Sequence, residues 1–354
     1  MKRIVFIFLA LFAVSAHAGN YAQREEVQAF IAAMQARHGL DAERLAALFQ
    51  KTRPLPAVLK AIAPPADPGI RSWAAYRQRF IDPRRIRAGL DFWRQHQATL
   101  ARAEAHFGVP AEIIVAIIGI ETFYGKQLGR FDSFAALATL AFDYPPRAEL
   151  FRRELEALLL LARDEGRAPD SYIGSFAGAI GLPQFLPSSI RAYAVDFDGS
   201  GRIDLTASPA DAIGSAANFL KEHGWETGGP IALKVGAGGT ASAAPAMLIG
   251  TAHQPLIDEG IKPARRPAEM TGFGVDIPAA APAAPAALID LVTPAAPTEY
   301  WLGYQNFYVI TRYNRSSFYA MTVMQFAQTL QEQRTGLYCA AGYSVSTCRV
   351  QERD

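Results

Sequence analysis

The strongest constraint on the fold is one stretch, residues 109–125, which is apolar on every side of the helix that it predicts. Pro110 suits the first position of a helix and Gly125 the residue just past its end, so about fourteen residues lie between the two signals. A helix that is apolar all round belongs inside a core. The chain must therefore fold around this helix. Its apolar residues are Ile113, Ile114, Val115, Ala116, Ile117, Ile118 and Ile120.

Glu121 places one carboxylate near the far end of this apolar segment. Burial disfavours the charged form of a carboxyl group, so we expect Glu121 to have a raised pKa and to keep its proton near neutral pH. A general acid needs that property. From position alone, an ion pair with an Arg or a cap on a neighbouring helix explains Glu121 equally well. Glu112 lies on the opposite side of the helix and is a poor partner for it.

Four segments stand in an order that one enzyme family shares: 118–125 (IGIETFYG), 135–147 (AALATLAFDYPPR), 174–189 (GSFAGAIGLPQFLPSS) and 300–314 (YWLGYQNFYVITRYN). They resemble the membrane-bound lytic transglycosylase B family, whose members cleave peptidoglycan. The similarity covers most of residues 70–225 and 286–330. It implies a lysozyme-like helical core. It also implies cleavage of the β-1,4 bond between N-acetylmuramic acid and N-acetylglucosamine without water, which leaves 1,6-anhydromuramic acid ends.

The resemblance also implies roles for particular residues. Glu121 would be the catalytic acid, and eight residues would bind the glycan strand. From the residues alone, the Gly-rich run 174–189 could be a mere connecting loop or a segment that approaches a ligand closely. Tyr76 alone would be a packing aromatic. The eight expected binding residues are Tyr76, Ser175, Phe176, Gly178, Gln184, Tyr313, Asn314 and Tyr319.

Ordinary glycosidases need two carboxylates around the scissile bond, and near Glu121 only Asp132 and Asp143 are candidates for the second. A hydrolytic muramidase is the alternative function if either one holds a water molecule. A non-catalytic peptidoglycan-binding protein is the alternative from another class. The family instead uses one acid, and the substrate's acetamido oxygen stabilises the developing cation. Motifs of metalloproteases, serine hydrolases and nucleotide-binding proteins are absent from the sequence, so no organic cofactor is expected.

Residues 196–211 begin like an EF-hand calcium loop. Asp196, Asp198 and Ser200 offer oxygen atoms at alternate positions before a Gly, as calcium requires. The twelfth position, where a bidentate Glu belongs, is Ala207. From the pattern alone a plain turn fits as well, but related enzymes of the family bind calcium with Asp211 closing the shell. The resemblance therefore implies a structural calcium with these ligands: Asp196, Asp198, Ser200, the backbone carbonyl of Arg202, and Asp211.

The first 18 residues combine a basic start, an apolar run over 4–14 and a small-x-small end at 16–18, which predicts a secretory signal peptide. The run has eleven residues, whereas a membrane span needs about twenty. No Cys follows the signal, so we expect no lipid anchor and a soluble, periplasmic protein. Without residues 1–18 the basic and acidic residues are equal in number, which argues against nucleic acid as a partner.

The remaining pattern predicts a mainly helical chain with a small β subdomain. The expected parts are the signal peptide (1–18), an N-terminal helical region (19–82), the catalytic core (83–227), the β subdomain (228–311) and a C-terminal region (312–354). Residues 83–107 are expected to be one long helix, and strands are expected at 231–235, 246–251, 286–292 and 299–311. A helix is expected over Ser317–Gln333. Cys339 and Cys348 are expected to form a disulfide in an oxidising compartment, with free thiols as the alternative.

Overall fold

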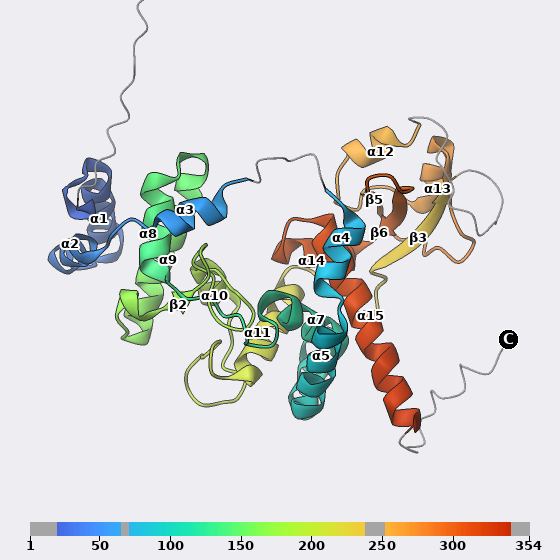
Figure 1. Ribbon diagram of the computed structural model, residues 1–354, viewed down its shortest axis with the longest axis horizontal. Helices are drawn as coiled ribbons and strands as arrows, with labels where there is room; N and C mark the ends of the chain where they lie inside the picture. The colour runs from blue at the N-terminus through green and yellow to red at the C-terminus, as the bar shows by residue number, and fades with distance from the viewer. Residues whose placement is uncertain (1–19, 65–70, 238–251, 341–354) are drawn as a thin grey trace, which may run out of the picture.

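The computed structural model describes residues 20–64, 71–237 and 252–340. Helices dominate, and the strands form one two-stranded and one four-stranded sheet (Figure 1). The predicted class, mainly helical with a small β part, is confirmed. The expected signal peptide over 1–18 and the disulfide expected at Cys348 lie outside the described residues.

The bounds of the elements are these. The helices are α1 (Glu25–His38), α2 (Ala42–Lys51), α3 (Pro56–Ile62), α4 (Trp73–Phe80), α5 (Pro83–Gln95), α6 (Gln97–Phe107), α7 (Ala111–Thr122), α8 (Ser133–Asp143), α9 (Ala148–Glu165), α10 (Pro187–Tyr193), α11 (Pro209–Glu222), α12 (Gln254–Asp258), α13 (Pro267–Met270), α14 (Gln305–Tyr313) and α15 (Ser317–Ala340). The strands are β1 (Phe131–Asp132), β2 (Ile173–Gly174), β3 (Ala232–Ala237), β4 (Val275–Asp276), β5 (Ala287–Leu291) and β6 (Glu299–Gly303).

Helix α7 lies inside the main core, as its composition predicts. All of its residues are buried except Glu112 and Glu121, which are partly exposed. Helices α5, α6, α11 and α15 pack against it. The helix is shorter than expected because Phe123 takes the left-handed conformation, with φ 50°, and ends it before Gly125 is reached.

The stretch 83–107, which the sequence predicts as one helix, is two helices. Helix α5 ends at Gln95 and α6 begins at Gln97, because His96 has φ −112° and ψ 23° and leaves the helical region. A straight helix over the whole stretch would be about 37 Å long and would leave the core at one end. The bend at His96 lets both halves pack on α7.

The four-stranded sheet has the order β4-β3-β6-β5, with antiparallel neighbours throughout, and it encloses a small core of its own. Leu302 of β6 lies opposite Leu233 of β3 on one side and Leu288 of β5 on the other. The strands expected at 231–235 and 286–292 are confirmed as β3 and β5. The strand expected at 246–251 lies outside the described residues.

The strand expected over 299–311 is wrong beyond Gly303. Helix α14 follows and buries Phe307 and Ile310 in the main core. These two residues have the spacing of a helix face, whereas Phe307 and Val309 alternate as in a strand, so the apolar run fits both patterns. Contacts with α11 and α15 decide in favour of the helix.

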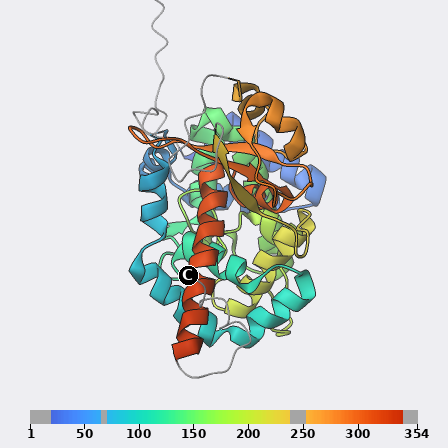
Figure 2. The same ribbon diagram turned by 90° about the vertical axis from the view of Figure 1, so that its right-hand side faces the viewer.

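Helix α15 returns the chain to the core and runs along α7 (Figure 2). The helix expected over Ser317–Gln333 is confirmed and extends to Ala340. The N-terminal helices α1 to α3 lie beside α8 and α9 (Figure 1). No single described helix is long and apolar enough to cross a membrane, and one bent pair, α6 with α7, passes that test by length and composition only. The predicted domain limits stay a prediction.

Truncating α7 should destabilise the whole molecule. Ile114 is fully buried, so Ile114→Ala should lower the free energy of unfolding by about 2–5 kcal/mol, through lost burial and the cavity left behind. Ile173, which is 52% exposed, provides the matched control, since Ile173→Ala should change it by less than about 0.5 kcal/mol. Urea unfolding measures both variants. Equal stability of the two variants would contradict the central position of α7.

Candidate active site

Glu121 lies in the last turn of α7, where its carboxyl group meets a phenol from another helix. The Tyr319 hydroxyl of α15 donates a hydrogen bond of 2.6 Å to Oε1 of Glu121. The residue is partly exposed, yet the protein atoms packed around its carboxyl group desolvate it and raise its pKa to about 7, against the opposing effect of the bond from Tyr319. Among the described residues no cation contributes to this pKa. The alternative explanation of Glu121, an ion pair with an Arg, therefore has no support among the described residues.

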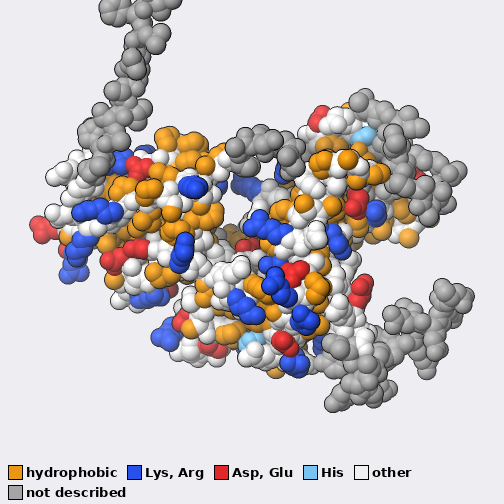
Figure 3. Space-filling model, in the orientation of Figure 1, with side chains coloured by type: hydrophobic (Ala, Val, Ile, Leu, Met, Phe, Trp, Pro, Cys, Tyr) orange, Lys and Arg blue, Asp and Glu red, His pale blue; other side chains and the backbone are white. Residues whose placement is uncertain are grey.

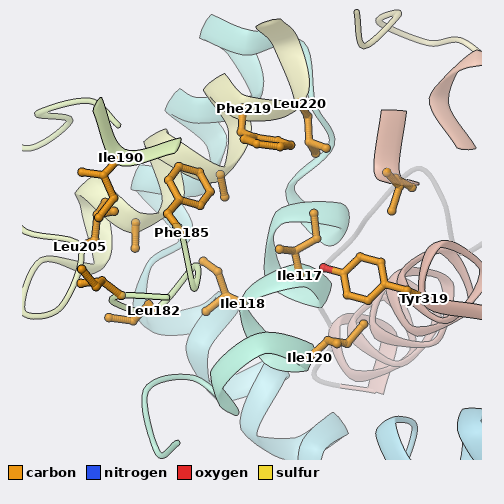
Figure 4. Packing of buried hydrophobic residues seen from close by; sticks show 14 of the residues in the cluster. Ile117, Ile118, Ile120, Leu182, Phe185, Ile190, Leu205, Phe219, Leu220 and Tyr319 are labelled. Carbon is orange, nitrogen blue, oxygen red and sulfur yellow. The ribbon is translucent and has the colours of Figure 1, made fainter. Parts of the chain in front are cut away.

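Three tyrosines from three helices surround the acid. Tyr76 of α4, Tyr313 of α14 and Tyr319 of α15 all have their pKa raised above the usual value by burial first and by the Glu121 carboxylate second. All three phenols therefore remain neutral across the range in which Glu121 titrates. The rings of Tyr313 and Tyr319 are nearly parallel, with centroids 6.4 Å apart. In Figure 4 the Tyr319 ring points from α15 toward α7, beside Ile117.

The Gly-rich segment 174–189 folds back on itself rather than merely connecting two helices. Ser175 Oγ accepts hydrogen bonds from the backbone N–H of Ala177 at 3.3 Å and of Ala179 at 3.1 Å, which leaves its own hydroxyl proton able to donate elsewhere. Gly178 has φ 79°, and a Cβ there would meet Leu137 at 2.6 Å. Only glycine fits that turn.

Other expected binding residues differ in exposure. Gln184 has φ 51°, and its amide nitrogen donates to the carbonyl oxygens of Gly181 at 2.9 Å and Leu128 at 3.3 Å, so its amide oxygen is left as an acceptor. Phe176 is half-buried and packs on the main core. Asn314 is exposed and follows the end of α14.

Two hydroxyl groups tie the Gly-rich segment to the acid's surroundings. Thr122, next to Glu121, donates to the Leu182 carbonyl at 3.0 Å, and Tyr313 donates to the Pro183 carbonyl at 2.6 Å. Adjacent carbonyls are thus held from α7 and from α14. Sequence reasoning missed Thr122, although a hydroxyl that follows an acid in an apolar helix was a usable signal.

Asp132 and Asp143, the candidates for a second carboxylate, both have other partners. Asp132 caps α8, accepting from the N–H groups of Phe134 at 2.8 Å and Ala135 at 3.1 Å. Asp143, at the other end of α8, pairs with Arg24 at 2.6 Å and accepts from the Tyr21 hydroxyl. Neither contributes to the pKa of Glu121. The two-carboxylate arrangement of a hydrolytic muramidase has no support here.

The expected metal ligands come together in the loop 196–211. Asp196, Asp198 and Asp211 each offer one carboxylate oxygen, and these oxygens lie within 4.8 Å of one another. The Ser200 hydroxyl donates to the Arg202 carbonyl at 3.1 Å, which brings the other two expected ligands together. Carboxylate, hydroxyl and carbonyl oxygens are the donors that calcium prefers.

Asp211 differs from the other two carboxylates because it is fully buried. Its oxygens accept from the N–H groups of Phe197 at 2.8 Å, Asp198 at 3.2 Å and Asp204 at 2.8 Å. Asp198 is exposed, and hydrogen bonds, first from the Ser208 hydroxyl, lower its pKa to about 2. The backbone thus already shapes the loop around oxygen atoms, so these residues fit a calcium ion in type and in spacing.

The loop 196–211 also touches the Gly-rich segment. Leu182 N–H donates to the Leu205 carbonyl at 2.8 Å, and a Cβ at Gly181 would meet that same carbonyl oxygen at 2.5 Å. Asp204, next to Leu205, is bound through its N–H to Asp211. The adjacent residues Asp204 and Leu205 therefore link the carboxylate cluster to the Gly-rich segment.

The model of the Transglycosylase SLT domain family matches residues 22–328. A relative from Escherichia coli (strain K12), membrane-bound lytic murein transglycosylase B, is 40% identical over 327 residues, which cover 88% of this chain and 84% of the relative. The chain belongs to this family of lytic murein transglycosylases, enzymes that act on peptidoglycan.

Two solved relatives of this transglycosylase hold ligands. The Escherichia coli lytic transglycosylase Slt35, solved with calcium, has 39% identity and a TM-score of 0.76, and the match covers 90% of this chain and 96% of that one. SltB3 from Pseudomonas aeruginosa, solved with NAG-anhNAM-pentapeptide, has 31% identity and a TM-score of 0.71, over 88% of this chain and 80% of that one. The lysozyme-like fold expected for the transglycosylase is confirmed.

The raised pKa of Glu121 should make the transglycosylase less stable as pH rises. Below the ordinary pKa of 4.5 the carboxyl group is protonated in both states, and between 4.5 and about 7 only the unfolded chain ionises. Above pH 7 the carboxyl group is ionised in both states, and the folded state bears the full free-energy cost of the desolvated charge. Glu121→Gln removes it, so the variant's excess stability should grow from near zero at pH 4.5 to at most about 3 kcal/mol at pH 8.

Thermal melting across this pH range measures the effect. Glu332→Gln, the same substitution at an exposed position of α15, is the control and should melt like the wild type throughout. A melting difference between Glu121→Gln and wild type that does not change with pH would contradict the raised pKa.

Proposed function

We propose that Glu121 alone supplies the proton transfers of a non-hydrolytic cleavage between N-acetylmuramic acid and N-acetylglucosamine. The observation that carries the proposal is an enclosed carboxyl group with a pKa near 7 and no carboxylate beside it among the described residues. A group with this pKa is protonated in a large fraction of molecules at neutral pH, and after donation its conjugate base can take a proton back.

The reaction balances with one acid and no water. Protonated Glu121 donates to the glycosidic oxygen, the bond from C1 to that oxygen breaks, and N-acetylglucosamine leaves with a free hydroxyl. The acetamido oxygen of the muramic acid stabilises the positive charge at C1. The Glu121 carboxylate then takes the proton of the C6 hydroxyl, and O6 bonds to C1, which releases the acetamido group and closes the 1,6-anhydro ring.

Tyr319 suits this cycle because it donates only to Oε1. Its hydrogen bond stabilises the carboxylate that forms after donation, and burial stabilises the protonated acid before it. The two opposing effects keep the pKa of Glu121 close to neutrality, where a group that must act as acid and then as base is most effective.

The residues around Glu121 would bind the glycan strand. The rings of Tyr76, Tyr313 and Phe176 would line the site, since aromatic rings and sugar faces pack well against each other. The unused donor of Ser175 and acceptor of Gln184 suit the acetamido group. Gly178 lets the backbone approach the sugar, and Asn314 lies at the rim. The complex of SltB3 with NAG-anhNAM-pentapeptide supports an anhydro sugar as the species bound.

The face of the molecule seen in Figure 3 is hollowed between the side of α8 and α9 and the side of α4 and α14. An open hollow suits a long polymer better than an enclosed pocket does. Peptidoglycan lies outside the cytoplasm, so the proposed place of action is the periplasm. The named relative is membrane-bound. The soluble form expected for this chain and the exclusion of nucleic acid as a partner both stay predictions.

Digestion of purified peptidoglycan tests the proposed reaction. The wild type should release 1,6-anhydromuropeptides, which are one water lighter than hydrolysed products in mass spectrometry. Glu121→Gln should lower the rate by about 100-fold or more, because the amide keeps the shape but cannot donate and recover a proton. Reducing ends as the sole products would refute the transglycosylase step, and a Glu121→Gln rate above a tenth of wild type would refute the role of Glu121.

We further propose that the loop 196–211 binds calcium in a structural role, on the support of its oxygen cluster and of the calcium complex of Slt35. The ion would order the backbone that holds Leu205 against the Gly-rich segment, and it would take no part in proton transfer. The residues that would hold it are Asp196, Asp198, Ser200, Arg202 through its carbonyl, and Asp211.

Calcium should raise the melting temperature of protein first shown to be metal-free. A ligand at a hundredfold excess over its dissociation constant stabilises the fold by about 2.7 kcal/mol. Asp198→Ala should diminish the difference between millimolar calcium and chelator, whereas Asp91→Ala, at an exposed carboxylate of α5, should leave it unchanged. Identical melting curves of the wild type in calcium and in chelator would disprove the site.

A further inference from the structure

The turn that ends α7 directly after the acid is built against the backbone preference of its residues. Phe123 and Tyr124 have φ 50° and 57°, a left-handed conformation that usually requires glycine. Such residues persist only where surrounding contacts hold them. Helix ends otherwise fray by a residue or two, and here Glu121 is the residue before the last one of the helix.

Tyr124 is the residue that these contacts hold most tightly. Its ring stacks on Phe92 of α5, with centroids 5.2 Å apart, and its tip fits between Gly89 of α5 and Gly119 of α7. A Cβ built at either glycine would overlap the Tyr124 hydroxyl oxygen. That hydroxyl is buried and has no hydrogen-bond partner among the described residues. The slot therefore fits the shape of the ring and gives the hydroxyl nothing to bind.

Arg85 fixes the other residue of the turn. Its guanidinium lies 4.9 Å from the centre of the Phe123 ring, and its Nε donates to the Gly119 carbonyl at 3.2 Å. The same carbonyl accepts from the Phe123 N–H at 3.1 Å. Arg85 and the turn thus share one backbone acceptor, the Gly119 carbonyl, two residues before the acid. Side chains of α5 reach both residues that follow Thr122.

We propose that Tyr124 is a positioning residue: its ring, locked between Gly89 and Gly119, holds the left-handed turn that fixes Glu121 against Tyr319. The inference rests on the proposed function of Glu121. A displacement of about 1 Å in a catalytic group can cost about 100-fold in rate, so a frayed end of α7 would disable the acid without removing it. The ring is needed, and the hydroxyl is not.

The charged and titratable groups near the acid bear on the test. Among the described residues they are the phenols of Tyr76, Tyr313 and Tyr319, which stay neutral, and two cations at the turn. Arg85 lies 4.9 Å and Lys126 Nζ 4.8 Å from the centre of the Phe123 ring, and neither contributes to the pKa of Glu121. A looser turn would admit water to Glu121 and lower its pKa. The loss of activity at rising pH would then begin at a lower pH.

Substitutions at Tyr124 separate the ring from the hydroxyl. Tyr124→Phe should keep kcat within twofold of wild type and melt no lower, since it removes only an unpartnered polar atom. Tyr124→Leu should lower kcat at least tenfold with KM within twofold, and move the basic limb of the pH profile down by at least half a unit. Val58→Ala, a core truncation in α3, is the control and should lower the melting temperature with no change in that limb.

The glycine slot gives a second test that does not depend on Tyr124→Leu folding. Gly89→Ala should lower kcat, because the new methyl group displaces the ring. Gly89→Ala combined with Tyr124→Phe should recover part of it. Without the hydroxyl the nearest ring atom would lie 3.2 Å from the methyl carbon, while Leu330 Cδ2, at 2.7 Å, has to shift equally in both variants.

The outcomes decide between the two proposals. Glu121→Gln, assayed in parallel on the same peptidoglycan, tests the acid itself, and an active Glu121→Gln would overturn the proposed function. If Glu121→Gln is inactive, then an unshifted pH profile in Tyr124→Leu, or no recovery of Gly89→Ala by Tyr124→Phe, overturns the positioning role alone.

Discussion

The desolvation of one carboxyl group is the interaction on which the rest of this structure depends. Glu121 stands at the end of a helix that is otherwise apolar, and burial there raises its pKa to about 7. A nearby cation would cancel that effect, because an opposite charge within a few ångströms favours the carboxylate. The described residues around the carboxyl group are neutral phenols instead, and one of them, Tyr319, donates a hydrogen bond to it. The surroundings must therefore be polar enough to bind sugar and yet carry no charge.

Neutral groups and backbone bonds meet that requirement. Hydroxyl groups connect α7, α14, α15 and the Gly-rich segment around Glu121. Thr122 and Tyr313 hold the carbonyls of Leu182 and Pro183, and the loop of Asp211 supports the same segment from behind through Leu205. The carboxylates of Asp196, Asp198 and Asp211 are thus separated from the acid by backbone, and none of them contributes to the pKa of Glu121.

The sequence predicts what depends on local pattern and misses what depends on distant partners. The burial of α7 and the isolation of Glu121 follow from an apolar run with one acid in it. The helix that contains Phe307 was mistaken for a strand because a short apolar run satisfies both periodicities, and only packing on α11 and α15 decides. The break between α5 and α6 at His96 likewise depends on packing, because both helices contact α7. The slot for Tyr124 joins residues of two helices, so no local pattern reveals it.

Two costly features coincide at one helix end. The raised pKa of Glu121 and the left-handed turn at Phe123 and Tyr124 each lower stability, and neither would be retained for folding alone. The residues that compensate are apolar or glycine: the isoleucines of α7, and Gly89 and Gly119 against the Tyr124 ring. The same close packing that partly desolvates the carboxyl group also holds the turn. Desolvation of the acid and its orientation therefore depend on the same packing. A substitution that loosens this packing should weaken both.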